Sequence, residues 1–328
     1  MPVVLPVEVV PESAVPREVQ PRLLLITPPN SYRTVAYLAA ARRRAIDVLI
    51  ASEGRYSLVS ELAGGLQIDL ENPAALQQLL DAGTRQAFAG VVATDDAVVE
   101  LGSRVARALG LPHNPPEAAQ FSRRKDLSRQ VLADAGVPVP RFRLVRLDAP
   151  LNTQIASVAY PCVVKPLALS GSRGVIRADD AGGLVSAVER VRRLLAVEYA
   201  SESGLSGQVL VEDFVPGQEV ALEGMLHEGR LVVLAIFDKP DPLDGPFFEE
   251  TYYVTPSRHP AGTRERIIRR VQQACTALGL REGPVHAEVR IRDDDGVIME
   301  VASRTIGGDC ARLLQFGTGE GLKDMVIS

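Results

Sequence analysis

Hydrophobic and polar positions follow two alternating patterns along the first third of the chain. Three apolar runs have the length of buried strands and end at turn residues, namely 22–29, 47–52 and 88–96. Three segments with helical spacing follow them, namely 31–45, 72–83 and 97–110. Strands alternating with helices predict a parallel sheet with helices on both faces, so we expect a small doubly wound α/β domain over about residues 22–115.

Local signals refine this segment. Ser31 is a predicted N-cap, and the second helix has a capping Asn72, Pro73 in its first turn and a terminal Gly83. Ligands of such sheets lie beyond the carboxyl ends of the strands. That rule places a group of polar residues near a cleft: Thr27, Asn30, Ser31, Thr94 and Asp95. No G-x-G-x-x-G motif follows the first strand, so a dinucleotide site is not supported.

The pattern changes after residue 110. Prolines mark a junction, and a basic helix is then predicted up to Gly136. Strands and helices alternate again over 142–209, and 208–237 reads as three strands in a meander. A long amphipathic helix is predicted over 263–280, and a hairpin follows around Asp294-Asp295-Gly296. Residues 320–328 resemble a helix that has just begun, so we expect the chain to be cut short relative to a longer parent.

Composition and charge exclude several classes of protein. The net charge of −5 argues against a general nucleic-acid binder, and the absence of Trp argues against a base-stacking surface. The three cysteines are far apart, which favours reduced thiols in the core over disulfides or a zinc site. No apolar run reaches about 18 residues, so no membrane span is predicted. Residues 1–21 carry prolines and acids, unlike a signal peptide, and we expect a cytoplasmic protein with an extended N-terminal arm.

A lysine in an apolar strand marks the first candidate site. Lys165 follows Cys162-Val163-Val164, and the small-residue loop Ser170–Gly174 comes directly after it. Glycine lets a backbone approach phosphate closely, and consecutive N–H groups form an anion-binding concavity. The motif is not a Walker loop. The alternative is an ordinary turn after a strand whose lysine extends into solvent.

The predicted hairpin supplies a second candidate site. His286, Glu288, Arg290 and Arg292 share one face of its first strand, and on the partner strand Met299 and Val301 point opposite to Glu300. If the register brings Glu288 and Glu300 to one face, two carboxylates meet in an apolar framework and a Mg²⁺ ion resolves the cost of burying them. The alternative is that one glutamate faces solvent and pairs with an arginine.

A third candidate lies between them in the sequence. An apolar strand ends at Glu212-Asp213-Phe214, and Glu219 follows. Such a strand end can offer Glu212 and backbone groups to an adenine amine, with Glu219 accepting hydrogen bonds from ribose hydroxyls. The alternative is that both glutamates are solvated residues of an edge strand.

In this order the motifs resemble the ATP-grasp superfamily of carboxylate–amine ligases, nearest the branch of L-amino-acid ligases (dipeptide synthases). The resemblance covers about residues 115–320 and rests on Lys125, Lys165 with "SGSRGV", Glu212 and Glu219 in "VEDFVPGQE", and Glu288 with Glu300. It implies an N-terminal doubly wound parallel-sheet domain followed by a two-part ATP-grasp fold with antiparallel sheets. The implied divisions are an arm over 1–21, a Rossmann-like domain over 22–117, a small lid subdomain over 118–210 and a large subdomain over 211–328, truncated at its C-terminus.

The resemblance also implies roles for residues. The residues implied in ATP binding are Lys125 and Lys165 at the phosphates, Ser170, Gly171, Ser172 and Gly174 in the closing loop, Glu212, Asp213, Phe214 and Val215 at adenine, and Glu219 at the ribose. Glu288 and Glu300 are the implied ligands of Mg²⁺, with Mn²⁺ as an alternative. The implied catalytic residues are Arg304 at the transferred phosphate, Lys239 as a further phosphate contact, and His286, which acts on the amine or, as we favour, supports the site. Gly307 and Gly308 are expected to offer backbone donors to a substrate carboxylate.

One position departs from the family pattern. An asparagine metal ligand is common two residues after the second glutamate, but Ala302 stands here, so one metal contact must come from water, must come from Ser303 or is missing. This departure puts occupancy by two metal ions in doubt.

The implied reaction joins a small carboxylic acid to an amine through an acyl-phosphate. The expected partners are small molecules, with no nucleic acid and no membrane. A homodimer is the default expectation for the assembly. Candidate substrate-reading residues are Glu249, Glu250, Tyr252 and Ser257. Two alternatives stay open: carboxylation or phosphorylation of a small metabolite, and non-catalytic nucleotide binding.

Overall fold

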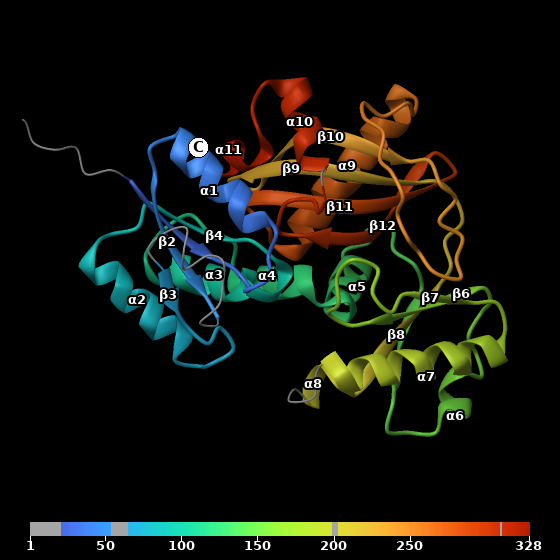
Figure 1. Ribbon diagram of the computed structural model, residues 1–328. Coiled ribbons are helices and arrows are strands. Elements are labelled where there is room, and N and C mark those ends of the chain that lie inside the picture. The colour runs from blue at the N-terminus through green and yellow to red at the C-terminus, as the bar shows by residue number, and fades with distance from the viewer. Residues whose placement is uncertain (1–20, 54–64, 199–202, 309) are drawn as a thin grey trace, which may run out of the picture.

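The computed structural model describes residues 21–53, 65–198, 203–308 and 310–328. The predicted N-terminal arm therefore lies outside the described residues, apart from Pro21. Three sheets of four strands each organise the described part of the chain (Figure 1). One is parallel and two are antiparallel, which confirms the predicted fold class.

The parallel sheet has the strand order β3-β2-β1-β4. Its strands are β1 Arg22–Ile26, β2 Asp47–Ser52, β3 Gly65–Gln67 and β4 Gly90–Ala93. Its connections carry α1 Arg33–Arg43, α2 Ala75–Arg85, the 3-10 turn η1 Asp96–Val98 and α3 Val99–Ala108. Leu24, Ile26 and Leu79 are fully buried in its core, as apolar strands between helices require. The short β3 was not predicted from the sequence.

Three predicted helix ends are wrong. Ser31 is not an N-cap, because α1 begins at Arg33 and the Ser31 hydroxyl instead donates to Asp95, 2.5 Å away. Gly83 does not end α2, which continues to Arg85. Asn72 is not the cap either, because α2 begins at Ala75 with Ala74 as its N-cap, and Pro73 also precedes the helix. The Asn72 side-chain oxygen accepts from the Ala74 N–H at 2.9 Å in the turn before it.

The second sheet is antiparallel with the order β5-β8-β6-β7. Its strands are β5 Phe142–Arg146, β8 Gln208–Asp213, β6 Cys162–Pro166 and β7 Ile176–Ala178. The helices in this segment are α6 Leu151–Ile155, α7 Ala181–Glu198 and the short α8 Ser203–Ser206. The apolar face of α7 buries Leu184, Val188 and Val191 against the sheet.

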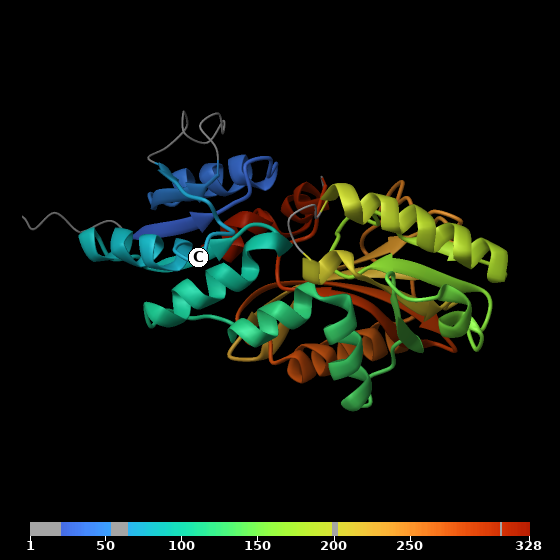
Figure 2. The same ribbon diagram turned by 90° about the horizontal axis from the view of Figure 1, so that it is seen from below.

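The third sheet is antiparallel with the order β10-β9-β11-β12. Its strands are β9 Glu219–His227, β10 Arg230–Lys239, β11 Gly283–Arg292 and β12 Asp295–Ala302. The predicted long helix is α9 Ala261–Leu278, and it covers one face of this sheet. In Figures 1 and 2, α7 and α9 lie on opposite sides of the molecule with the two antiparallel sheets between them.

Two predictions about connectivity are corrected. The segment 208–237 forms three strands but no meander, because β8 pairs with β5 and β6 of the second sheet while β9 and β10 form a hairpin in the third. The predicted basic helix is two helices, α4 Pro116–Arg123 and α5 Lys125–Asp134, separated at Arg124 by an extended backbone with φ −93° and ψ 105°. That break puts Lys125 at the start of a helix instead of on a solvated face.

Ala118, Leu132 and Val137 of the α4–α5 region pack in the core of the third sheet. The division of the chain at residues 117 and 210 stays a prediction. The three cysteines are buried and unpaired, as predicted. Among the described helices, none combines the length and apolarity that a bilayer crossing demands.

The C-terminal helices return to the parallel sheet. α10 Cys310–Thr318 and α11 Leu322–Val326 follow the third sheet, and α11 lies beside α1 (Figure 1). Arg43 of α1 pairs with Asp324 through two hydrogen bonds of 2.9 and 2.6 Å. Next to it, Lys323 is buried and donates to the Thr305 hydroxyl.

Lys323 predicts a pH dependence of stability. Burial lowers the pKa of Lys323 from 10.5 to about 7. Between these values the folded chain holds fewer protons than the unfolded chain, so the free energy of unfolding rises with pH and is lowest below pH 7. We expect this residue alone to add about 2 kcal/mol between pH 6.5 and 8.5. Denaturant unfolding of wild type and Lys323→Met at both pH values checks this, and an unchanged pH dependence in the variant would contradict it.

Candidate active site

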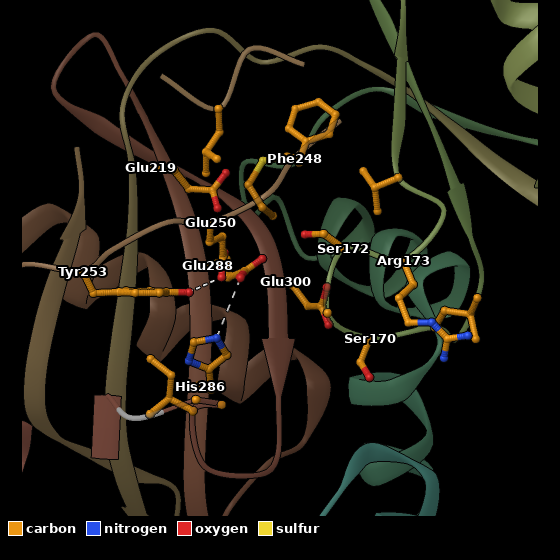
Figure 3. A pocket seen from close by; sticks show the side chains of 18 of the residues that line it. Ser170, Ser172, Arg173, Glu219, Phe248, Glu250, Tyr253, His286, Glu288 and Glu300 are labelled. Carbon is orange, nitrogen blue, oxygen red and sulfur yellow. Dashed lines mark hydrogen bonds and ion pairs between the residues drawn. The ribbon is translucent and has the colours of Figure 1, made fainter. Parts of the chain in front are cut away.

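A cavity of about 910 Å³ lies between the two antiparallel sheets and extends to the end of the parallel sheet. Most of the predicted site residues line it: Lys125, Lys165, Ser170, Gly171, Ser172, Asp213, Phe214, Val215, Glu219, His286, Glu288, Glu300 and Arg304. Figure 3 shows Glu219, Glu250 and Glu288 on one side of the cavity and Ser170, Ser172 and Arg173 on the other. The sequence motifs, far apart in the chain, therefore meet at one site.

One face of the third sheet forms the acidic wall. Strand pairing places Glu288 of β11 directly opposite Glu300 of β12. This is the register that the sequence left open, and it brings both carboxylates to the cavity. Met299 was predicted to point away, but it also lines the cavity, because the register shifts between Glu288 and Val289. A bulge of this kind turns two successive residues toward one side.

Basic groups neutralise these carboxylates. The Glu288 carboxylate lies 3.0 Å from the Lys239 ammonium and 3.8 Å from His286 Nε2. Burial by itself raises the pKa of Glu288, but Lys239 and His286 outweigh it and hold the pKa well below its ordinary value. The Glu300 carboxylate lies 3.3 Å from Lys125. Both glutamates thus offer carboxylate oxygens to the cavity.

Their chemistry fits a divalent cation. Two carboxylates that line one cavity are typical ligands of Mg²⁺. Ala302 pairs with His286 across the strands, so an imidazole lies opposite the position that lacks a ligand. Ser303 does not supply the contact, because its hydroxyl bonds with Ser122 at 2.8 Å and it lies outside the residues that line the cavity.

The prediction that Glu212 contacts adenine is corrected by its position. Glu212 is 1% exposed and does not line the cavity. Its carboxylate lies 2.7 Å from Lys165 Nζ and 2.5 Å from Arg129 Nε. Burial raises the pKa of Glu212, but Arg129 and Lys165 together bring it below its usual value. Glu212 therefore stays ionised and holds Lys165 toward the cavity from behind.

Lys239 also differs from its prediction. Its ammonium contacts the carboxylates of three glutamates, at 2.7 Å for Glu219, 3.0 Å for Glu288 and within hydrogen-bond distance for Glu250. These three carboxylates are close enough to one another to hold a cation, and the Lys239 ammonium already contacts all three. A lysine has three N–H donors, so this arrangement leaves none for a phosphate. Lys239 is a positioning residue that keeps the acidic wall together.

Aromatic and basic side chains form the far end of the cavity. The Phe214 ring lies 4.4 Å from the Arg177 guanidinium and 5.1 Å from that of Arg290. Arg290 also donates to the Val215 carbonyl at 2.8 Å and to Glu219 at 3.0 Å. Both carboxylate oxygens of Glu219 are therefore engaged, one by Lys239 and one by Arg290. Arg290 fixes the segment that follows β8.

The loop Ser170–Gly174 faces the acidic wall. Gly171 has a φ of +65° with open space around it, and it lines the cavity. Gly174, predicted as part of the closing loop, has a φ of +74° and does not itself line the cavity. A Cβ on Gly174 would approach Pro166 Cγ to 2.8 Å and Leu194 Cδ2 to 2.9 Å. Gly174 therefore anchors the loop against β6 and α7.

This difference between two glycines predicts different costs of substitution. Gly174→Ala adds overpacking to backbone strain, so we expect it to lower the free energy of unfolding by about 2–4 kcal/mol. Gly171→Ala, where only the backbone is strained, should cost about 1 kcal/mol. Chemical denaturation of both variants measures the difference. Equal losses would show that the contacts of Gly174 with Pro166 and Leu194 do not constrain the loop.

The parallel sheet contributes the remaining wall. Arg304 is 8% exposed, and its Nε donates to Asp96 at 2.9 Å, directly after β4. Asp95 also lines the cavity and accepts from Ser31 and from Thr94. Thr27 and Thr94 are fully buried behind it, and Asn30 is exposed outside the cavity lining, so only part of the predicted cleft group reaches the site.

Sequence reasoning missed one buried carboxylate. Glu223 of β9 is 0% exposed, pairs with His286 Nδ1 at 3.2 Å and accepts from the Ile306 N–H at 3.0 Å. Burial lowers the pKa of His286, but its hydrogen bonds to Glu223 and Glu288 raise it to about 9. Both ring nitrogens of His286 thus face carboxylates, which favours the supporting role over a base. The signal was present, since Glu219 and Glu223 share one strand face by period-two alternation.

The loop after β10 lies above the acidic wall. Glu250, Tyr252 and Tyr253 line the cavity, and the Tyr253 hydroxyl donates to Glu250 (Figure 3). Glu249 and Ser257 do not line it, so only two of the predicted substrate-reading residues, Glu250 and Tyr252, reach the site.

Comparison with known proteins shows which family the chain resembles. Residues 158–312 match the model of the ATP-grasp domain. The chain is 31% identical over 284 residues to the uncharacterized protein y4rH of Sinorhizobium fredii. The aligned region covers 85% of this chain and 57% of that relative. It is 31% identical over 217 residues to the D-alanine–D-alanine ligase of Gloeobacter violaceus, covering 63% of this chain and 67% of that enzyme. The fold resembles the L-amino acid ligase of Bacillus licheniformis, with a TM-score of 0.78, 25% identity, and coverage of 94% of this chain and 73% of the other.

The chain therefore belongs to the ATP-grasp family, as the resemblance implied. It spans about half to two thirds of the length of these two curated relatives.

Proposed function

We propose that the protein is an ATP-dependent carboxylate–amine ligase that joins an amino acid or a related small acid to an amine through an acyl-phosphate. The observation that carries this proposal is the convergence of Glu288 and Glu300, paired across two strands, with Lys125, Lys165 and Arg304 around one cavity. Acidic ligands for a cation and basic groups for phosphate are the two requirements of phosphoryl transfer. The relatives and the similar structure named above include ligases of amino acids.

The proposed first step activates the acid. An oxygen of the substrate carboxylate attacks the γ-phosphorus of ATP, the bond from that phosphorus to the β–γ bridging oxygen breaks, and ADP leaves. Lys125, Lys165 and Arg304 offset the charge on the phosphates, and Glu288 and Glu300 would hold Mg²⁺, which supplies further neutralisation when bound. Arg304 is already fixed by Asp96, so little reorganisation accompanies its contact with the transferred group.

The proposed second step forms the amide. The amine nitrogen attacks the acyl carbon and releases a proton to solvent. The carbon–oxygen bond to phosphate breaks, so phosphate carries away the oxygen that attacked ATP. Water must be excluded while the acyl-phosphate exists. The loop Ser170–Gly174 faces the acidic wall across the cavity, and closing it over the phosphates would exclude water.

The nucleotide and substrate positions follow from the same walls. We place adenine between Phe214 and Val215 and the ribose beside Glu219, at the end of the cavity fixed by Arg290. Glu250 is ionisable, lines the cavity and lies beside Tyr253, so it is our candidate for reading a substrate amino group.

A panel of amino acids tests the proposal. The protein is incubated with ATP, Mg²⁺ and pairs of amino acids, ADP release is measured, and products are identified by mass spectrometry. Release that requires an acid and an amine, with an amide of matching mass, supports ligation. Release that depends on bicarbonate instead indicates carboxylation, a phosphorylated product indicates a kinase, and ATP binding without turnover across the panel contradicts an enzymatic role.

A further inference from the structure

A second buried guanidinium lies on the cavity wall beyond Arg304. Arg33, at the start of α1, has a side chain that is 8% exposed and lines the cavity next to Tyr32. Its Nη1 pairs with Asp95, and its guanidinium lies 4.7 Å from the centre of the Tyr32 ring. Its Nε is buried and has no hydrogen-bond partner among the residues that the structure describes. A buried donor without a partner is costly, and its presence on a cavity wall indicates a ligand.

Two consecutive aspartates hold the two arginines. Asp95 pairs with Arg33, and Asp96 accepts from Arg304 at 2.9 Å. Ser31 and Thr94 donate to Asp95 at 2.5 and 2.6 Å, so the carboxylate that fixes Arg33 is itself fixed. Two consecutive aspartates after β4 therefore hold two guanidinium groups in the wall of one cavity. Two guanidinium groups in one cavity wall can bind two anionic groups.

The backbone beyond Arg304 approaches Arg33 closely. Gly308 donates its N–H to the Tyr32 hydroxyl at 2.9 Å. A Cβ on Gly307 would lie 2.9 Å from that hydroxyl and 3.3 Å from Arg33 Nη2. Glycine at 307 therefore keeps a side chain away from the Nη2 side of the guanidinium, and the ion pair with Asp95 uses Nη1 and leaves the Nε–Nη2 edge unpaired. The sequence led us to expect that Gly307 and Gly308 donate to a substrate carboxylate. Because the Gly308 N–H already donates to Tyr32, Arg33 is the better donor for that carboxylate.

We propose that the Nε–Nη2 edge of Arg33 binds the carboxylate of the amine-bearing substrate, which restricts that substrate to amino acids or similar molecules carrying both groups. This inference rests on the proposed ligase function. The fork of an arginine matches the two oxygens of a carboxylate. The carboxylate of the acid substrate is consumed in the reaction next to Arg304, whereas the carboxylate of the amine substrate persists and needs its own cation.

The test compares each acceptor amino acid with its carboxamide. The acid substrate is held constant, and L-alanine and L-alaninamide are offered as acceptors. The other amino acids of the panel are offered in the same way, as the free acid and as the carboxamide. The amide products are quantified by mass spectrometry. Wild type should prefer the free acid. Arg33→Met should raise the KM for L-alanine by about 10- to 150-fold, the effect of one hydrogen-bonded charge pair, and leave the KM for ATP and for L-alaninamide unchanged.

Two further variants separate recognition from charge and folding. Arg33→Lys keeps the charge but not the fork, so it should restore only part of the preference. Arg43→Met removes an arginine from the same helix, outside the cavity lining, and should leave the preference intact. Thermal unfolding of each variant checks that the chain is folded.

The outcomes distinguish this inference from the proposed function. Ligation with equal efficiency for acids and carboxamides, or an unaltered preference in Arg33→Met, overturns the role of Arg33 and leaves the ligase proposal standing. If no pair yields an amide, the ligase proposal fails, and binding is then read from the rise in unfolding temperature with L-alanine and with L-alaninamide. A larger rise with L-alanine that is lost in Arg33→Met supports a carboxylate site at Arg33, and equal rises overturn it.

Discussion

Replacing Glu300 with Gln should lower turnover by about 100- to 1,000-fold while the chain stays folded. The change keeps the size of the side chain but removes the charge that faces Glu288 across the strands and Lys125 at 3.3 Å. A neutral amide is a weaker ligand for a divalent cation, so the phosphates would lose most of their neutralisation. Glu300 is more informative than Glu288, because Glu288 also contacts Lys239 and His286.

Steady-state ADP release and thermal unfolding of Glu300→Gln measure this effect. Binding of Mn²⁺ in the presence of a non-hydrolysable ATP analogue, followed by electron paramagnetic resonance, gives a second readout that does not need turnover. Glu265→Gln, an exposed position on α9, is the matched control and should behave as wild type. Near-normal turnover and Mn²⁺ binding in Glu300→Gln would remove Glu300 from the mechanism.

Replacing Glu212 with Gln should lower the free energy of unfolding by about 3–5 kcal/mol, because it leaves buried positive charge without its counter-ion. Glu212 and Arg129 are each 1% exposed, and Lys165 is held by the same carboxylate. The variant should also weaken ATP binding, since Lys165 loses the group that directs it toward the cavity.

Two comparisons isolate this effect. Asp213→Asn, at the next position, breaks a pair with Arg141, whose side chain is 84% exposed, and should cost about 1 kcal/mol or less. In the double variant Arg129→Met with Glu212→Gln, much of the lost stability should return. The buried positive charge of Arg129 is then removed together with the carboxylate that neutralised it. Denaturant unfolding of the single and double variants measures the coupling, and a Glu212→Gln chain as stable as wild type would contradict the buried network.

The positions that the sequence predicted well are those set by local periodicity. Alternation places His286, Glu288 and Arg290 on one face of β11, but an unbroken register would pair Glu288 with Met299. The sequence left the register open, and the shift between Glu288 and Val289 is what brings Glu300 opposite Glu288. The apolar runs of the parallel sheet are equally local signals. The bulge beside Met299 is not, because nothing in the residue types marks the extra residue.

Burial and long-range pairing explain what the sequence did not reveal. Glu212 and Lys239 lie at strand ends, as predicted, but their partners come from other elements and turn them into supports for the residues that face the cavity. Arg33 resembled one of several basic residues on a helix until the ion pair with Asp95 placed it in the cavity wall. Spacing along one element cannot show which side chains of another element will meet it.

The transfer of oxygen from the acid substrate to phosphate tests the central claim most directly. The carboxylate of the acid is labelled with ¹⁸O, the reaction is run with ATP and the amine, and the phosphate released is analysed by mass spectrometry. An acyl-phosphate intermediate predicts one ¹⁸O atom in each phosphate that accompanies an amide. Amide formation with unlabelled phosphate would contradict the intermediate and, with it, the proposed ligase mechanism.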